Sequence, residues 1–238
     1  MLGKTSRSSQ VKNIHLCIDN NPLQELLKAL VLEWGYCLAD NPAEYPLLLI
    51  SEGLKPPGDF KHTLAFSSTH CQDRQRLAVP LTVETLYLAL ENHFHRTPRN
   101  HIRICVDWPI RVRVRGREFA TRAVTLADRG IRFISPFELA QAEEMEIHIE
   151  REDEIYDLHA RVVYSIAGRE IGRGDNIEVG AVCTPQSKEV RESIRSRIIG
   201  NYLKRVRPVL GSNLFAEALR QLNLTRMSAT IAISRSAD

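Results

Sequence analysis

RTPRNHIRICVDWPIRVRVRGREFATRAVTLADRG, residues 96–130, combines a dense run of arginines with alternating polar and apolar residues. Residues 110–115 alternate Ile or Val with Arg, which is the period of two that a half-buried β-strand requires. Over residues 96–132 the chain carries ten arginines and three acidic residues. Exposed strand positions account for the arginines of residues 110–115, but less well for the three that precede them, Arg96, Arg99 and Arg103. The one-sided charge favours an anionic partner.

Seven short strands with turns between them are predicted from residue 102 onward, a pattern typical of a small antiparallel barrel. They cover residues 102–106, 110–115, 119–126, 130–134, 145–149, 158–165 and 177–182. The segment GREIGRGD, residues 168–175, is predicted to be a hairpin between the last two strands. Acidic residues dominate the later strands, where they alternate with apolar positions and are explained as exposed side chains.

The first 95 residues alternate short apolar segments with two amphipathic helices. Asn20-Asn21-Pro22 predicts a helix start, and Gly35 lies where the left-handed residue after a helix end belongs. The second helix is predicted over residues 82–94, and five apolar segments predict strands. This order implies an α/β sandwich with a largely parallel sheet. The strand segments are residues 11–18, 36–39, 46–50, 63–66 and 76–79.

After the barrel, Thr184-Pro185 or Ser187 predicts the start of a helix in which apolar residues recur every four positions as far as Val206. This helix is expected to cover the open end of the barrel; pairing with a second copy, which would give a homodimer, is the alternative. The sequence thus predicts a two-domain α+β chain. Its divisions are an α/β domain at 11–95, a β-barrel with its following helix at 96–206, and a helical or flexible tail at 207–238, loosely ordered from Thr225.

Composition excludes several classes of protein. The 238 residues are 43% hydrophobic and 26% charged, an ordinary globular balance, and no apolar run approaches the length of a bilayer span. We therefore expect a soluble cytoplasmic protein without membrane insertion. The five cysteines contain no C-x-x-C pair, and His93 and His95 lie on opposite sides of a predicted helix, so we expect no metal site. No catalytic motif is present, so neither an enzyme nor a cofactor is expected.

The N-terminal part resembles a shortened response-regulator receiver domain without its chemistry. Asp19 stands where the metal-binding acids of a receiver follow the first strand, Ser67 lies near the position of the fourth-strand hydroxyl, and Pro80 near that of the proline after the fifth strand. Ser51 replaces the phosphoacceptor aspartate, and Val79 replaces the lysine. Because aspartyl phosphate needs a carboxylate nucleophile and a Mg²⁺ site, we expect a structural or interaction role and no phosphorylation.

Arg99-Asn-His-Ile-Arg103 forms an R-x-x-x-R element just before a barrel strand, and Thr125-Leu-Ala-Asp-Arg-Gly130 follows one strand pair later. The two elements resemble the ligand signature of PilZ domains, R-x-x-x-R followed by (D/N)-x-S-x-x-G. The resemblance covers residues 96–205, including VGAV at 179–182. It implies a protein that binds cyclic di-GMP and relays its level to flagellar, pilus or polysaccharide machinery, in motility or biofilm formation.

The resemblance also implies the ligand-binding residues. Arginine can make paired hydrogen bonds to guanine or phosphate, and a glycine permits a tight turn and close backbone approach. Thr125 and Ala127 depart from the Asp/Asn and Ser of the signature, and at about 1–2 kcal/mol for each lost contact they weaken binding roughly tenfold to a thousandfold. Asp128 lies one residue too late to replace Ala127. The implied set is Arg99, Arg103, Thr125, Ala127 and Gly130, with Arg96 and Arg129 as additional residues.

Three functions follow from this pattern. The first is a cyclic di-GMP effector in which the two domains reorient on binding. The second is a PilZ adaptor that has lost the ligand and acts only through protein contacts. The third, a nucleic-acid binder, is disfavoured because only 6% of residues are aromatic and no stacking series is present. The intact arginine pair favours the first.

Overall fold

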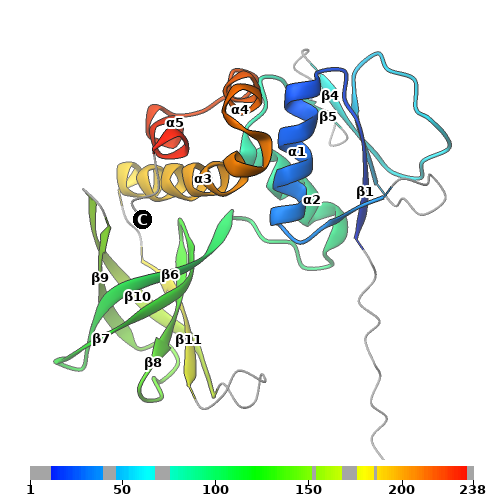
Figure 1. The fold of residues 1–238 in the computed structure, drawn as a ribbon. Coiled ribbons are helices and arrows are strands. Elements are labelled where there is room, and N and C mark those ends of the chain that lie inside the picture. The colour runs from blue at the N-terminus through cyan, green and yellow to red at the C-terminus, as the bar shows by residue number, and fades with distance from the viewer. Residues whose placement is uncertain are drawn as a thin grey trace, which may run out of the picture. The chain divides into compact units, whose positions relative to one another are not determined.

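A computed structural model describes residues 12–39, 47–67, 76–151, 154–167, 176–184 and 187–234 of the chain. It divides into two compact units, one formed by residues 99–200 and the other by residues 1–98 together with 201–238 (Figure 1). The predicted hairpin at 168–175 and the N-terminal residues 1–11 lie outside the described part.

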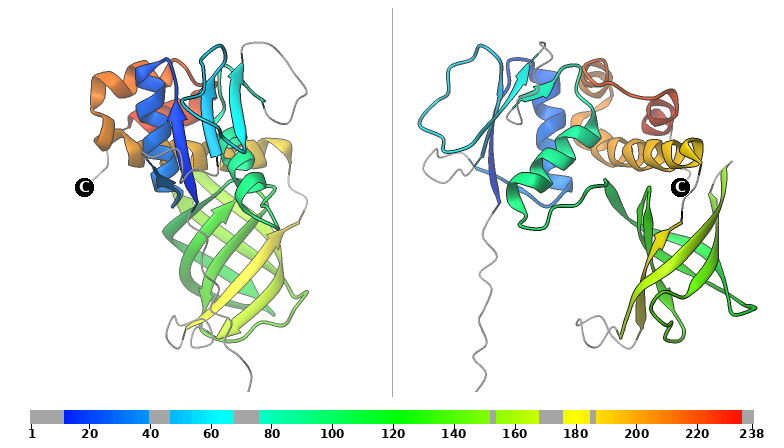
Figure 2. Two further views of the ribbon diagram at one scale, coloured as in Figure 1. Left: turned by 90° about the vertical axis from the view of Figure 1, so that its right-hand side faces the viewer. Right: turned by 180° about the vertical axis from the view of Figure 1, so that it is seen from behind.

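Within residues 99–200, six strands close into an antiparallel barrel (Figure 2). Their order around the barrel is β10-β11-β8-β7-β6-β9. Alternation along each strand separates an apolar interior from a polar exterior. One interior row crosses five strands through Ile104, Leu126, Ile131, Ala181 and Val162, all of them buried. The strands are β6 (Arg103–Val114), β7 (Arg117–Ala127), β8 (Gly130–Ser135), β9 (Glu144–Arg151), β10 (Glu154–Ala167) and β11 (Ile177–Cys183).

The barrel has six strands where the sequence predicts seven. The predicted strands at 102–106 and 110–115 are one long strand, β6, whose pairing with β7 shifts register between Cys105 and Trp108. A β-bulge of this kind absorbs residues that break the alternation without ending the strand. Pro109, which lacks a backbone N–H, is tolerated there as an exposed residue of β6. Arg115 and Gly116 then turn the chain into β7, both with positive φ, as a two-residue hairpin requires.

The other unit contains a five-stranded sheet in the order β2-β1-β3-β4-β5, parallel throughout, which confirms the predicted α/β domain. β3 reads LLLIS and is buried along its whole length, as expected of a strand covered on both faces. Asn20 caps α1 by accepting a hydrogen bond from Leu23 N at 2.9 Å. The elements are β1 (Asn13–Cys17), α1 (Asn21–Glu33), β2 (Cys37–Leu38), β3 (Leu47–Ser51), β4 (Thr63–Ser67), β5 (Arg76–Ala78) and α2 (Val83–Phe94).

The C-terminal helices correct the predicted domain divisions. α3 (Lys188–Leu210), α4 (Ser212–Leu219) and α5 (Arg226–Ile233) follow the barrel, and residues from 201 onward group with the N-terminal unit. The segment 207–234 is therefore part of a folded unit, not a separate tail. The reason is packing: α4 contacts α1 and buries Phe215 and Ala218, and Asn223 N donates a hydrogen bond to Leu81 O at 2.8 Å.

Within the described ranges, no helix has both the length and the apolar character that crossing a membrane would require.

Candidate functional site

A pocket of about 440 Å³ lies on the outer face of the barrel, across β6, β7, β8, β11 and β10. Strand register explains how distant parts of the chain meet there, because residues paired across neighbouring strands share a face. Two adjacent rows line the pocket. The first runs through Arg103, Ala127, Gly130 and Val182, and the second through Thr125, Arg132, Gly180 and Tyr164.

Small residues at the centre of these rows create the hollow. The Tyr164 ring lies over Gly180, so that a Cβ on Gly180 would fall 2.3 Å from it. A Cβ on Gly130 would fall 3.0 Å from the Ala181 carbonyl oxygen. Gly130 therefore serves the close approach of two backbones, between β8 and β11, and its φ is not in the positive range.

Arg132 is held from two sides at this pocket. Its Nε donates to Thr125 Oγ1 at 3.0 Å, and its Nη1 donates to Glu178 Oε1 at 2.8 Å. The Glu178 side chain is only 6% exposed and that of Arg132 25%. A nearly buried carboxylate requires a cationic partner, so this ion pair fixes the arginine.

The two positions that depart from the signature offer the ligand little. Thr125 is buried, and its hydroxyl accepts the hydrogen bond from Arg132. Ala127 is also nearly buried and carries no polar side-chain atom. Neither residue presents the paired acceptors of a carboxylate or amide.

Asp128 is the buried centre of an ion cluster beside the pocket, and its partner His101 lines the pocket. Its side chain is fully buried, Arg195 Nη2 of α3 lies 2.7 Å from Oδ2, and His101 Nδ1 lies 3.0 Å from Oδ1. Burial, with the Asp128 carboxylate second, raises the pKa of the nearby Cys183 thiol to about 12. Asp128 is thus committed to holding α3 and the segment before β6, and it does not line the pocket.

The N-terminal half of α3 is fastened to β10 by a second cluster within the barrel unit. Arg197, itself buried, binds Glu154, and Tyr156 donates a hydrogen bond to the same carboxylate. Tyr156 Oη also lies 3.0 Å from Ser193 Oγ. Burial, and then the hydrogen bond with Glu154, raises the pKa of Tyr156. Residues 188–200 therefore pack on the barrel, as the covering interpretation predicts.

The structure brings most of the sequence-predicted site together. Arg103, Thr125, Ala127, Gly130 and Arg129 all line the pocket. Arg99 is exposed, four residues before Arg103, and is not among the lining residues. Arg96 groups with the other unit.

Sequence reasoning did not assign to the site the residues that complete the second row, namely Arg132, Gly180 and Tyr164, nor His101, which also lines the pocket. The only signal available was the alternation of each strand, which indicates a face but not the partner across the sheet. Arg132 stands two residues after Gly130 and was counted in the arginine cluster without a role.

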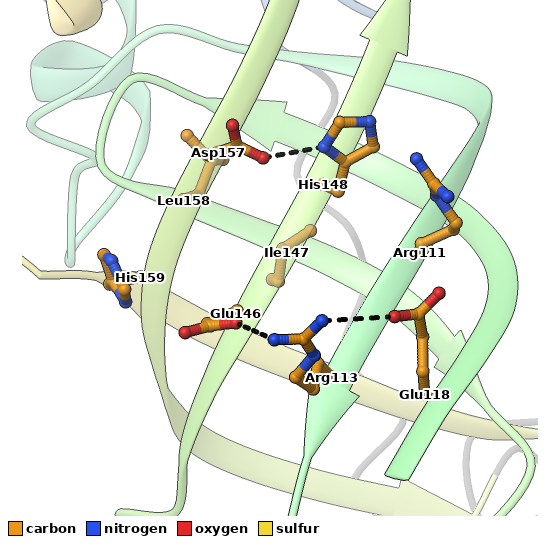
Figure 3. A pocket seen from close by; sticks show the side chains of 9 residues that line it. All are labelled: Arg111, Arg113, Glu118, Glu146, Ile147, His148, Asp157, Leu158 and His159. Atoms are coloured by element: carbon orange, nitrogen blue, oxygen red, sulfur yellow. Dashed lines mark hydrogen bonds and ion pairs between the residues drawn. The ribbon is translucent and has the colours of Figure 1, made fainter. Parts of the chain in front are cut away.

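A second hollow of about 360 Å³ lies on another part of the barrel exterior, over β6, β9 and β10 (Figure 3). Its charges pair across the strands: Arg113 lies 3.3 Å from Glu146 and 3.7 Å from Glu118, and His148 lies 2.7 Å from Asp157. Pairing of this kind between exposed side chains is typical of a solvated strand face.

At the carboxyl edge of the parallel sheet, the side chains at the positions that resemble a receiver's active site are engaged in hydrogen bonds with neighbouring carboxylates. Ser51 Oγ donates to Asp19 Oδ1, and Ser67 Oγ donates to Glu52 Oε2, each at 2.6 Å. Among the described residues, no group of three metal-ligating side chains is placed to hold an ion. The receiver resemblance stays a prediction.

Comparison with known families decides what the barrel is. The family model of the PilZ domain matches residues 97–200, which coincide with the barrel and the first half of α3. Residues 97–200 are a PilZ domain. No curated protein matches the chain.

Solved structures similar to the chain include PilZ proteins. One is the inhibitor of motility MotI/DgrA of Bacillus subtilis, at 12% identity and a TM-score of 0.41 over 47% of this chain and 54% of that one. Another is the PilZ domain of YcgR from Escherichia coli with c-di-GMP, at 12% identity and a TM-score of 0.33 over 41% and 86%. A third is the K. pneumonia MrkH–c-di-GMP complex, at 12% identity and 0.40 over 47% and 55%. The match thus spans about half the length of MotI/DgrA and of MrkH.

Proposed function

We propose that the PilZ domain binds cyclic di-GMP and that the protein is a non-enzymatic effector of this second messenger. The observation that carries the proposal is the pocket itself, in which Arg103 and Gly130, two invariant positions of the signature, meet on one face of the barrel. Arg129, an exposed arginine, also lines the pocket and adds a second cation there.

The pocket suits a ligand with phosphates and guanines. Arginine's planar fork makes paired hydrogen bonds to either group and stacks on a base face. Arg103 is partly exposed at the start of β6, and Arg99 lies on the exposed segment that leads into it. Ligand anions would draw this segment toward the barrel, with Arg99 and Arg103 on the same molecule.

The cluster around Asp128 supports a route from the pocket to α3. Asp128 belongs to the turn between Ala127 and Gly130, and its carboxylate holds both His101, inside the R-x-x-x-R element, and Arg195 of α3. α3 continues past Gly200 as one helix to Leu210. We infer that ligand binding changes the contacts that Asp128 makes with α3, and that the two units then reorient. The output would be a protein of the motility, biofilm or polysaccharide machinery, as the family resemblance implies.

Titration calorimetry of the full-length protein with cyclic di-GMP, with GTP and cyclic GMP as controls, tests the binding. We expect saturable binding that Arg103→Ala weakens, because charged hydrogen bonds contribute about 1.5–3 kcal/mol each, roughly tenfold or more in affinity. Arg111→Ala is the matched control, since Arg111 is an exposed arginine of the same strand outside this pocket. Equal loss in both variants would mean that the effect is general charge and not this pocket.

The alternative function is a PilZ adaptor that acts only through protein contacts. Thr125 and Ala127 favour it, because the hydroxyl of Thr125 is already engaged by Arg132 and Ala127 offers no polar atom. Absence of heat at high cyclic di-GMP concentration, together with an unshifted melting temperature, would select this function. Capture of a protein partner by the full chain would then be the next measurement.

A further inference from the structure

We propose that Arg132, positioned by Thr125 and Glu178, is the group that reads the ligand on the barrel, in place of the carboxylate or amide of the signature. The inference rests on the proposed function, because it names how the same pocket recognises cyclic di-GMP. On this proposal, Thr125 and Ala127, which depart from the signature, do not simply remove contacts with the ligand. They accompany the replacement of a hydrogen-bond acceptor by the donor groups of Arg132.

The hydrogen bonds of Arg132 leave part of its guanidinium available. An arginine carries five N–H donors, and the bonds to Thr125 and Glu178 use two of them. In the part of the chain that the structure describes, the Arg132 side chain makes no further hydrogen bond or ion pair. The side chain lines the pocket and remains 25% exposed, so the guanidinium keeps donors that the bonds to Thr125 and Glu178 do not use.

The guanidinium is oriented before any ligand arrives. The Glu178 side chain is 6% exposed and thus requires a cation, while Thr125 is buried beside Arg132 in the next strand. Two fixed anchors on β7 and β11 hold the fork in one plane. Preorganisation of this kind strengthens binding because less side-chain freedom is lost when the ligand binds.

A guanidinium and a carboxylate read opposite edges of guanine. A carboxylate or amide oxygen at position 125 would accept hydrogen bonds from N1–H and the 2-amino group of the base. Arg132 has only donors, so it recognises the O6 and N7 acceptors or a phosphate oxygen. This pocket therefore binds an anionic cyclic dinucleotide through the hydrogen-bond acceptors of the ligand. The 2-amino group of guanine makes no contact with Arg132 and does not contribute to the affinity of this pocket.

The test compares cyclic di-GMP with cyclic di-IMP, its analogue without the 2-amino groups, by titration calorimetry on the full-length protein. We expect the two dissociation constants to agree within about twofold, since the acceptors O6 and N7 are common to both bases. Arg132→Lys should lower the affinity for both ligands by roughly tenfold, because lysine keeps the charge beside Glu178 but lacks the planar guanidinium. Lysine preserves the ion pair, so the melting temperature should stay close to that of the unchanged protein.

Arg111→Lys, in an exposed arginine on the same barrel outside the pocket, is the matched control and should leave both affinities unchanged. Wild-type protein that binds neither ligand would overturn the proposed function and this inference together. Wild-type protein that binds cyclic di-GMP but loses tenfold or more with the inosine analogue, or that is insensitive to Arg132→Lys, would overturn the inference alone.

Discussion

At the scale of single residues, the pocket depends on an absent side chain. The Tyr164 ring occupies the space where a Cβ of Gly180 would lie, at 2.3 Å. Gly180→Ala must therefore displace the ring, and because the ring is the outer end of a half-buried side chain, we expect a cost of about 1 kcal/mol, the lower end of the range for overpacking. We expect a lower free energy of unfolding, measured by urea titration, and recovery when Tyr164→Leu is added, because the smaller side chain removes the conflict. Two additive losses in this double-mutant cycle would show that the residues do not conflict.

A second residue-scale prediction concerns His93 of α2. Burial, with His62 second, lowers the pKa of His93 below its usual 6.5. Just below pH 6.5 the unfolded chain then binds more protons than the folded protein, so the free energy of unfolding decreases as the pH falls through this window. His93→Gln should flatten this slope in urea titrations between pH 7.5 and pH 5, whereas His159→Gln, in an exposed barrel residue, serves as the control. Parallel slopes for His93→Gln and the unchanged protein would contradict the assignment.

At the scale of elements, the sequence predicted the helix caps and the strand segments, because these depend on residues that are close together in the chain. Asn20 caps α1 where the Asn-Asn-Pro sequence indicated, and every predicted strand segment overlaps an observed strand. The sequence did not predict that residues 103–114 form one strand, because the bulge depends on pairing with β7. It predicted Arg103 and Gly130 through the signature, but it did not predict that Arg132 is held by Glu178, a residue 46 positions later. Register across strands is set by the whole barrel, and alternation within one strand cannot supply it.

The attachment of α3 to the barrel is the element-scale prediction. The Asp128 side chain is fully buried, whereas its partners Arg195 and His101 are 36% and 32% exposed, so water can solvate them once the carboxylate is removed. Loss of the charged hydrogen bond then costs about 1.5–3 kcal/mol. Asp128→Ala should lower the urea midpoint reported by the fluorescence of Trp108 in the barrel. Asp157→Ala is the matched control, because this carboxylate is 78% exposed in its pair with His148 and such pairs contribute at most about 1 kcal/mol. Similar small losses in both variants would mean that Asp128 does not hold the helix.

At the scale of the whole molecule, the chain leaves its first unit, completes the barrel and returns to the first unit. The predicted tail is therefore a structural part of the N-terminal unit, and the two tryptophans of the protein report the units separately. Trp34 lies edge-on to Tyr87 and to Tyr202 of α3, with ring centroids 5.3 and 5.9 Å away, whereas Trp108 is buried in the barrel unit.

Phe215 of α4 provides the whole-molecule prediction, because it is 2% exposed and α4 packs on α1. Truncation of a buried Phe to Ala costs about 3–5 kcal/mol. Urea titrations can follow each tryptophan alone, Trp34 in a Trp108→Phe background and Trp108 in a Trp34→Phe background. We expect Phe215→Ala to lower the urea midpoint of the Trp34 signal. The urea midpoint of the Trp108 signal should stay unchanged. Glu217→Ala, in an exposed residue of the same helix, should change neither. An unchanged Trp34 midpoint would mean that the C-terminal helices do not stabilise the N-terminal unit. A decrease confined to the Trp108 midpoint would mean that they stabilise the barrel instead.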